Sequence, residues 1–75
     1  MHHLTHFPPQ SRIRINKIEA DVQVVRKLAS MGILPDVEVE VLHSSKKNSL
    51  VVIKRHNRRI VLRCNEALAI FCTLV

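Results

Sequence analysis

A single glycine sets the strongest constraint on how this 75-residue chain folds. Gly32 follows an amphipathic run in which Leu28 and Met31 share one helical face, which Val24 extends by one turn. A residue without Cβ easily adopts the left-handed conformation that ends many helices, so we expect Gly32 to terminate this one. Pro35 prevents the helix from continuing and fixes φ for a turn. The stretch therefore predicts a short helix, a stop at Gly32, and a turn into a strand.

Length and composition limit the chain to one small domain. A chain this short buries only about 60% of its unfolded surface, so its stability must come from a well-filled aliphatic core. The net charge of +6 favours an anionic partner, whereas the absence of Trp and Tyr argues against base stacking. No segment reaches the roughly 20 apolar residues of a membrane helix, and no signal peptide is recognisable. We therefore expect a cytoplasmic protein.

Residues 1–11 carry His and Pro with little periodicity, so we expect a flexible tail ahead of a domain over residues 12–75. His2, His3 and His6 are candidate metal ligands. The terminal amine and His3 could also enclose a square-planar Cu(II) or Ni(II) ion. Because the tail offers no residues to orient such ligands, we expect neither a resident metal nor another cofactor. Cys64 and Cys72 are too few and too far apart for a zinc site without His partners, and we expect free, half-buried thiols.

Alternating apolar residues predict strands in the rest of the chain. Arg12 to Ile18 alternates until a bulge or the end of the strand near Asn16 and Lys17, and Asp21 is a candidate helix N-cap. The other expected elements are a strand with Val37, Val39 and Val41 on one face, a polar loop over His43–Ser49, strands over residues 50–55 and 58–63, a helical turn capped by Asn65, and a last strand over residues 70–75. These five short strands predict a mainly β fold, curled into a small barrel and closed by the helix.

The expected hairpin carries the main candidate surface. Its turn is His56-Asn57, where Asn57 is the residue best able to adopt a positive φ. Its cations are Lys54, Arg55, Arg58 and Arg59. They have three interpretations: solvated protection of an edge strand, a docking patch for an acidic protein, or a surface for nucleic acid.

An apolar patch is the second candidate surface. With Val51, Ile53, Ile60 and Leu62 in the core, Leu42, Val52 and Val61 would lie on the opposite face of the sheet. If these three cluster in the open, they form a surface for a partner or for a second copy of the chain.

Catalysis has no support in the sequence. The chain has no nucleophile set at informative spacing and no phosphate-binding glycine loop. Glu38 and Glu40 share one strand face, where we expect a solvated rim rather than an acid–base pair. We therefore expect a protein that is not an enzyme.

Three blocks in order carry a family resemblance. The run Arg26-x-Leu28-x-x-Met31-Gly32-Ile33-Leu34-Pro35, followed by Ile60-Val61-Leu62-Arg63 and Glu66-Ala67-x-x-Ile70, resembles the signature of the FeoA family, small accessory proteins of bacterial ferrous-iron uptake. The resemblance covers residues 12–75, with Leu28, Met31, Gly32 and Pro35 as its structural motif. The chain departs from the family pattern at Asp36 and Asn57, where the family usually or often has glycine, so the turns there are slightly strained.

The resemblance implies an SH3-like barrel with an inserted helix. It also implies a partner, the cytosolic part of the membrane GTPase transporter FeoB. The two candidate surfaces described above then supply the candidate contact residues Lys54, Arg55, Arg58, Arg59, Val52 and Val61. The same fold occurs as a C-terminal module of metal-dependent repressors. The alternatives are therefore a basic barrel that binds nucleic acid and a detached module of such a regulator.

Overall fold

Alternating buried and exposed residues build most of this protein from strands. The computed structural model describes residues 1–45 and 49–75. Its elements are β1 (His2–His3), a 3-10 turn η1 (Leu4–His6), β2 (Arg12–Ile18), α1 (Val22–Ser30), β3 (Glu38–Ser45), β4 (Leu50–Arg55), β5 (Arg58–Arg63), α2 (Cys64–Ala67) and β6 (Ile70–Leu74). The loop predicted over His43–Ser49 is strand as far as Ser45, and its residues 46–48 lie outside the described residues.

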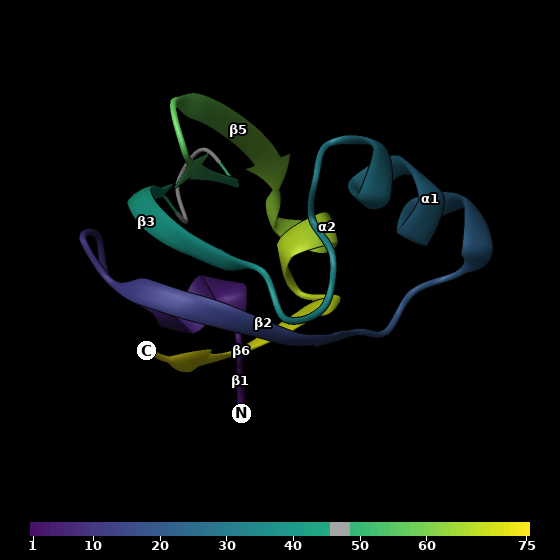
Figure 1. Ribbon diagram of the computed structural model, residues 1–75, viewed down its shortest axis with the longest axis horizontal. Coiled ribbons are helices and arrows are strands. Elements are labelled where there is room, and N and C mark those ends of the chain that lie inside the picture. Colours follow the sequence, from purple (N-terminus) through teal and green to yellow (C-terminus); the bar gives the residue numbers. More distant parts are fainter. Residues whose placement is uncertain (46–48) are drawn as a thin grey trace.

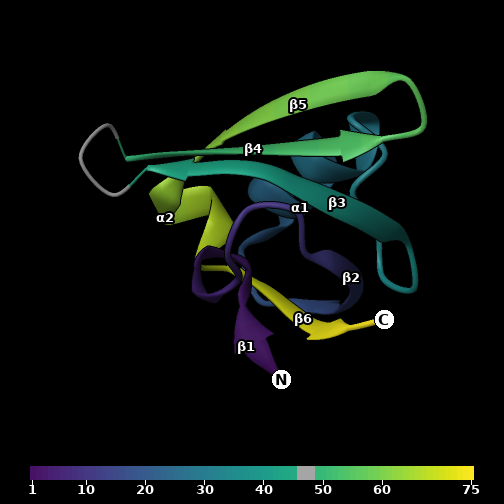
Figure 2. The ribbon, with the colours of Figure 1, turned by 90° about the vertical axis from the view of Figure 1, so that its left-hand side faces the viewer.

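All the strands belong to one antiparallel sheet in the order β1-β6-β2-β3-β4-β5. The sheet curls, so that β4 and β5 lie on one side of the interior and β6 and β1 on the other (Figure 2). The predicted five-stranded barrel is therefore confirmed only in part. The sheet has a sixth strand, and β1 and β5 stand at its two ends without pairing to each other among the described residues.

The helix predicted before Gly32 is confirmed, together with its cap. Asp21 Oδ1 accepts a hydrogen bond from the N–H of Val24 at 2.9 Å, as expected for an N-cap. Leu28 is buried, and Gly32 follows the helix with a φ of +85°. In the turn after it, Asp36 has a φ of +70°. This is the strain predicted at Asp36 because the family usually has glycine at this position.

One core lies between the curled sheet and the helices. Val51, Ile53, Ile60 and Leu62 share its inner face, as predicted. The bulge predicted near Asn16 and Lys17 is also present, because the register of β2 against β6 shifts between Ile15 and Lys17. Among the described residues, the buried apolar side chains are Leu4, Phe7, Ile13, Ile15, Leu28, Ile33, Val39, Val41, Val51, Ile53, Ile60, Leu62, Ala67, Ile70 and Cys72.

Residues 1–11 pack against the rest of the domain, contrary to the prediction of a separate flexible tail. Leu4 and Phe7 are only 1% and 4% exposed, and β1 pairs with β6. Figure 1 shows this first segment against the sheet, beside β2 and β6. The two side chains complete the core of a small domain, and β1 satisfies part of the edge of β6.

The second helix begins one residue earlier than predicted. It starts at Cys64, so Asn65 lies inside it and is not its cap. The carboxylate of Glu66 caps it instead, because Oε1 accepts the N–H of Arg63 at 3.1 Å. No helix in the described part of the chain is long and apolar enough to cross a membrane.

Candidate docking surface

The hairpin of β4 and β5 forms the strongest charged feature of the surface. Its two-residue turn pairs Arg55 with Arg58, and the next pair is Lys54 with Arg59. His56 takes the positive φ of this turn, at +55°, so the expectation that Asn57 would take it is wrong. Like charges therefore face each other in two successive pairs, an arrangement that destabilises a hairpin until an anion neutralises it.

Arg55 differs from the other cations of the hairpin because it is half-buried. Its Nη1 donates to the carbonyl oxygen of Gly32 at 3.0 Å, just beyond the C-terminal end of α1, where a cation is favoured. A Cβ on Gly32 would lie 2.5 Å from this Nη1. Arg55 therefore ties the hairpin to the helix, and the sequence contains no signal for this contact.

Lys54, Arg58 and Arg59 are exposed. Among residues 1–45 and 49–75, no carboxylate forms an ion pair with any of them. The hairpin is thus a positive surface that the described residues leave open to an anionic partner.

The predicted apolar patch is brought together only in part. Val52 and Val61 pair directly across β4 and β5, with Val61 57% exposed and Val52 half-buried. Leu42 lies where the register of β3 against β4 shifts, and it is half-buried. The exposed apolar surface next to the cations is therefore centred on Val61.

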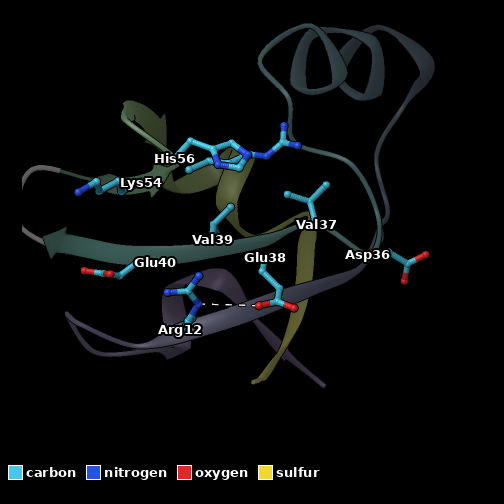
Figure 3. Close-up of a pocket in the computed structure, with 9 residues that line it drawn as sticks. Arg12, Asp36, Val37, Glu38, Val39, Glu40, Lys54 and His56 are labelled. Carbon is cyan, nitrogen blue, oxygen red and sulfur yellow. Dashed lines mark ion pairs between the residues drawn. The ribbon is translucent and has the colours of Figure 1, made fainter.

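A depression of about 510 Å³ lies between the hairpin and β3 (Figure 3). Lys54 and His56 border it from the hairpin, and Glu38 points away from them toward Arg12. Glu38 is 3.8 Å from Arg12 and 3.1 Å from Arg14, so its carboxylate is already ion-paired with β2. Glu38 therefore holds two strands together at the border of this depression.

The three histidines of the N-terminal segment do not converge. The rings of His2 and His6 stack at 4.0 Å, and the positive charge of His6 is the main cause that lowers the pKa of His2. His3 turns away, and its Nδ1 donates to the carbonyl oxygen of Leu68 at 2.6 Å. A square-planar site with the terminal amine would have to break this bond. In the described residues, no three His, Cys, Asp or Glu side chains form a cluster able to hold a metal.

Both cysteines are free thiols, as expected. Cys64 is half-buried beside Ser49 and Leu50. Cys72 is fully buried in the core, not half-buried as predicted, and this burial raises its pKa to about 12. Neither thiol belongs to the hairpin surface.

One family of known sequences matches nearly the whole chain. A sequence model described as the FeoA domain matches residues 2–74. The solution structure of iron(II) transport protein A from Clostridium thermocellum is 32% identical, with a TM-score of 0.88 over 97% of this chain. This chain spans 45% of the length of that protein. A comparison with curated protein sequences finds no match.

Two further structures share the fold at lower identity. The crystal structure of an iron uptake regulatory protein, FeoA, is 21% identical, with a TM-score of 0.88 over 96% of this chain and 95% of its own. A manganese-dependent transcriptional repressor is 23% identical, with a TM-score of 0.92 over 99% of this chain and 41% of its own. At these identities the likeness shows the fold alone.

Proposed function

Because this chain belongs to the FeoA family, we propose that it is a cytoplasmic, non-enzymatic accessory protein of ferrous-iron uptake. Its partner is the cytosolic part of a FeoB-type GTPase transporter. The observation that carries this proposal is the match to the family along nearly the whole chain, from residue 2 to residue 74.

The basic hairpin is the surface we assign to this docking. Lys54, Arg58 and Arg59 are exposed and lack ion pairs among the described residues, and Val61 adds exposed apolar surface beside them. Such a surface suits a partner face that combines carboxylates with apolar side chains. Arg55 contributes indirectly, because its bond to Gly32 fixes the hairpin against α1.

Docking regulates the transporter only when the affinity differs between two of its states. The states of a GTPase differ in the bound nucleotide, so we expect the affinity of this protein for the GTPase region to depend on nucleotide. Binding then shifts the transporter toward the preferred state.

An NMR titration of the ¹⁵N-labelled protein tests this proposal. The cytosolic GTPase region of the transporter from the same organism is added with and without a GTP analogue. We expect saturable shifts at β4 and β5 and an affinity that changes with nucleotide. Failure of the complete transporter in detergent to bind would rule the proposal out.

Two charge-reversal variants locate the surface. Arg59→Glu places a carboxylate on the hairpin, and Arg26→Glu makes the same charge change on exposed α1. We expect Arg59→Glu to weaken binding by at least about tenfold and Arg26→Glu to change it by less than about threefold, because only close charge pairs contribute strongly. Equal effects of the two variants would mean that general charge, and not the hairpin, governs binding.

Salt dependence separates docking from the alternative of nucleic-acid binding. Phosphate contacts weaken steeply with salt on any oligonucleotide, whereas docking selects one protein. The likeness to the manganese-dependent repressor gives no support for a regulator module beyond the shared fold.

A further inference from the structure

β5 is the long edge strand of the sheet, with six residues against two in β1. An edge strand presents backbone N–H and C=O groups with which another strand can pair. In an antiparallel hairpin, the residues that flank a two-residue turn exchange hydrogen bonds, and the pattern then alternates along the strands. Arg58 flanks the turn, so Arg59 and Val61 direct their backbone groups away from β4.

Two observed hydrogen bonds agree with this alternation. The N–H of Arg63 donates to Glu66 Oε1 at 3.1 Å, on the outer side of the strand. The next N–H, that of Cys64, donates to the carbonyl oxygen of Ser49, on the side of β4. Across the described ranges 1–45 and 49–75, no bond outside the ladder with β4 involves the backbone of Arg59 or Val61. The outer edge of β5 is therefore open between the hairpin turn and α2.

The side chains along this edge favour a particular neighbour. Arg59, Val61 and Arg63 lie on the exposed face of β5, while Ile60 and Leu62 point into the core. The two arginines on this exposed face favour a neighbouring strand whose carboxylates lie on the same face, which residue-by-residue alternation of acidic and apolar residues provides.

The protein itself contains one such pairing. β2 carries Arg12 and Arg14, and it pairs with β3 so that Arg14 lies opposite Glu38 and Arg12 opposite Glu40. Glu38 lies within ion-pair distance of both arginines. An acidic alternating strand is thus the neighbour that this chain already places beside an arginine-bearing strand.

A groove beside β5 provides room for an added strand. It has a volume of about 370 Å³ and is lined by Ser30 and Met31 at the end of α1 and by Arg58 to Val61 of β5. In Figure 2, β5 runs along the margin of the sheet farthest from β1, so no strand covers its outer edge. Met31 offers an apolar wall to side chains of an incoming strand.

We propose that β5 takes up an extended acidic segment of a protein partner as a seventh strand, by backbone pairing at Arg59 and Val61. The segment alternates acidic with apolar residues, so that its carboxylates lie beside Arg59 and Arg63. The inference rests on the proposed function only for the identity of the protein that supplies the segment.

A peptide copy of the chain's own acidic strand is the probe. Acetyl-DVEVEVL-amide repeats residues 36–42, and acetyl-DVKVKVL-amide is its charge-reversed control. With the ¹⁵N-labelled protein, we expect the acidic peptide alone to shift the signals of β5. We also expect it to slow hydrogen exchange at the amides of Arg59 and Val61, because pairing protects outward N–H groups from water.

Two substitutions at Val61 separate backbone pairing from side-chain contact. Val61→Pro removes the outward N–H and keeps a side chain of three carbons, whereas Val61→Ala keeps the N–H and removes most of the exposed side chain. We expect Val61→Pro to weaken peptide binding by at least about tenfold and Val61→Ala by less than about threefold. If Val61→Pro does not fold, N-methylation of the central valine of the peptide removes a donor from the other strand and should cause the same loss.

Several results would overturn strand addition. They are equal binding of the two peptides, equal effects of the two substitutions, and binding without protection of Arg59 and Val61. If an oligothymidylate of ten nucleotides slowed hydrogen exchange at Arg59 and Val61 more than the acidic peptide does, the edge would be assigned to nucleic acid instead. Peptide binding without transporter binding would leave this inference standing and remove the proposed function. Transporter binding with shifts confined to surfaces away from β5 would remove this inference and the assignment of docking to the hairpin, and would leave the accessory role standing.

Discussion

Gly32 meets two requirements at the residue scale. Its φ of +85° lies in the left-handed region, which costs an L residue about 1–2 kcal/mol. Its missing side chain also leaves room for Arg55, whose Nη1 donates to the Gly32 carbonyl at 3.0 Å. The first requirement is local and the second belongs to the contact between helix and hairpin.

Gly32→Ala should lower the free energy of unfolding by about 2–4 kcal/mol. Alanine at this position must adopt the unfavourable left-handed φ. Its Cβ would lie 2.5 Å from Nη1 and would displace Arg55 from its charged hydrogen bond. In an Arg55→Ala background the same substitution should cost only about 1–2 kcal/mol, since no guanidinium remains to be displaced. Urea unfolding measures both values, with Ser30→Ala as the control in the neighbouring turn. An identical cost in the two backgrounds would show that Arg55 is irrelevant to Gly32.

The two thiols should differ in reactivity because their surroundings differ. Burial raises the pKa of Cys72 to about 12, so on the order of one molecule in ten thousand carries its thiolate at pH 8. We expect a disulfide reagent to label one thiol per folded chain at pH 8 and two in denaturant, and Cys64→Ser to abolish the labelling of the folded protein. Equal labelling rates of the two thiols would contradict the burial of Cys72.

At the scale of elements, Glu66 joins the two helices. Its Oε2 is 2.8 Å from the Nζ of Lys27 on α1, and its Oε1 accepts the N–H of Arg63 at the start of α2. Both hydrogen bonds lower the pKa of Glu66, and the one with Lys27 has the larger effect. One carboxylate therefore caps a helix of four residues and orients a second helix beside it.

Glu66→Ala should lower the free energy of unfolding by about 1–2 kcal/mol at neutral pH, because both the cap and the ion pair are lost. Glu66→Gln keeps an acceptor for Arg63 and should lose about 0.5 kcal/mol, since Lys27 is largely exposed. The pKa is lower in the folded than in the unfolded protein, so the stabilisation is complete above the ordinary carboxyl range and disappears as pH falls through the folded-state value. The stability difference between wild type and Glu66→Gln should therefore shrink in acid, and a difference that persists at low pH would exclude this origin.

For the whole molecule, the N-terminal segment completes the core. Leu4 and Phe7 are buried beneath the curled sheet, and β1 extends it beyond β6. A domain of this size has a total stability of only about 4–11 kcal/mol, so two large side chains are a substantial part of its margin.

Leu4→Ala should cost about 2–5 kcal/mol and Phe7→Ala about 3–5 kcal/mol, because each leaves a cavity in the core. Thr5→Ala, in the same turn but only half-buried, is the matched control and should change stability by less than about 0.5 kcal/mol. Chemical unfolding of the three variants, with hydrogen exchange along β6, measures the effect. Unchanged stability in Leu4→Ala and Phe7→Ala would show that residues 1–11 do not contribute to the stability of the domain.

Periodic sequence was enough to predict the elements in the middle of the chain. Alternation located the strands and the bulge in β2, and Asp21 and Gly32 marked the two ends of α1, because these features depend on backbone geometry within a few residues. The cations of the hairpin were equally visible, since two adjacent strands with a two-residue turn must place them together.

Other features were decided by tertiary structure. Leu4 and Phe7 lie in a stretch without hydrophobic periodicity. Their burial depends on the space in the core and on the pairing of β1 with β6. The positive φ of the hairpin turn lies at His56 and not at Asn57, and Glu66 instead of Asn65 caps α2. By itself the sequence determined which segments are strands and helix, because periodicity is local. Only the fold determined which edge remains open and which cation is tied down, because these depend on contacts between residues far apart in the chain.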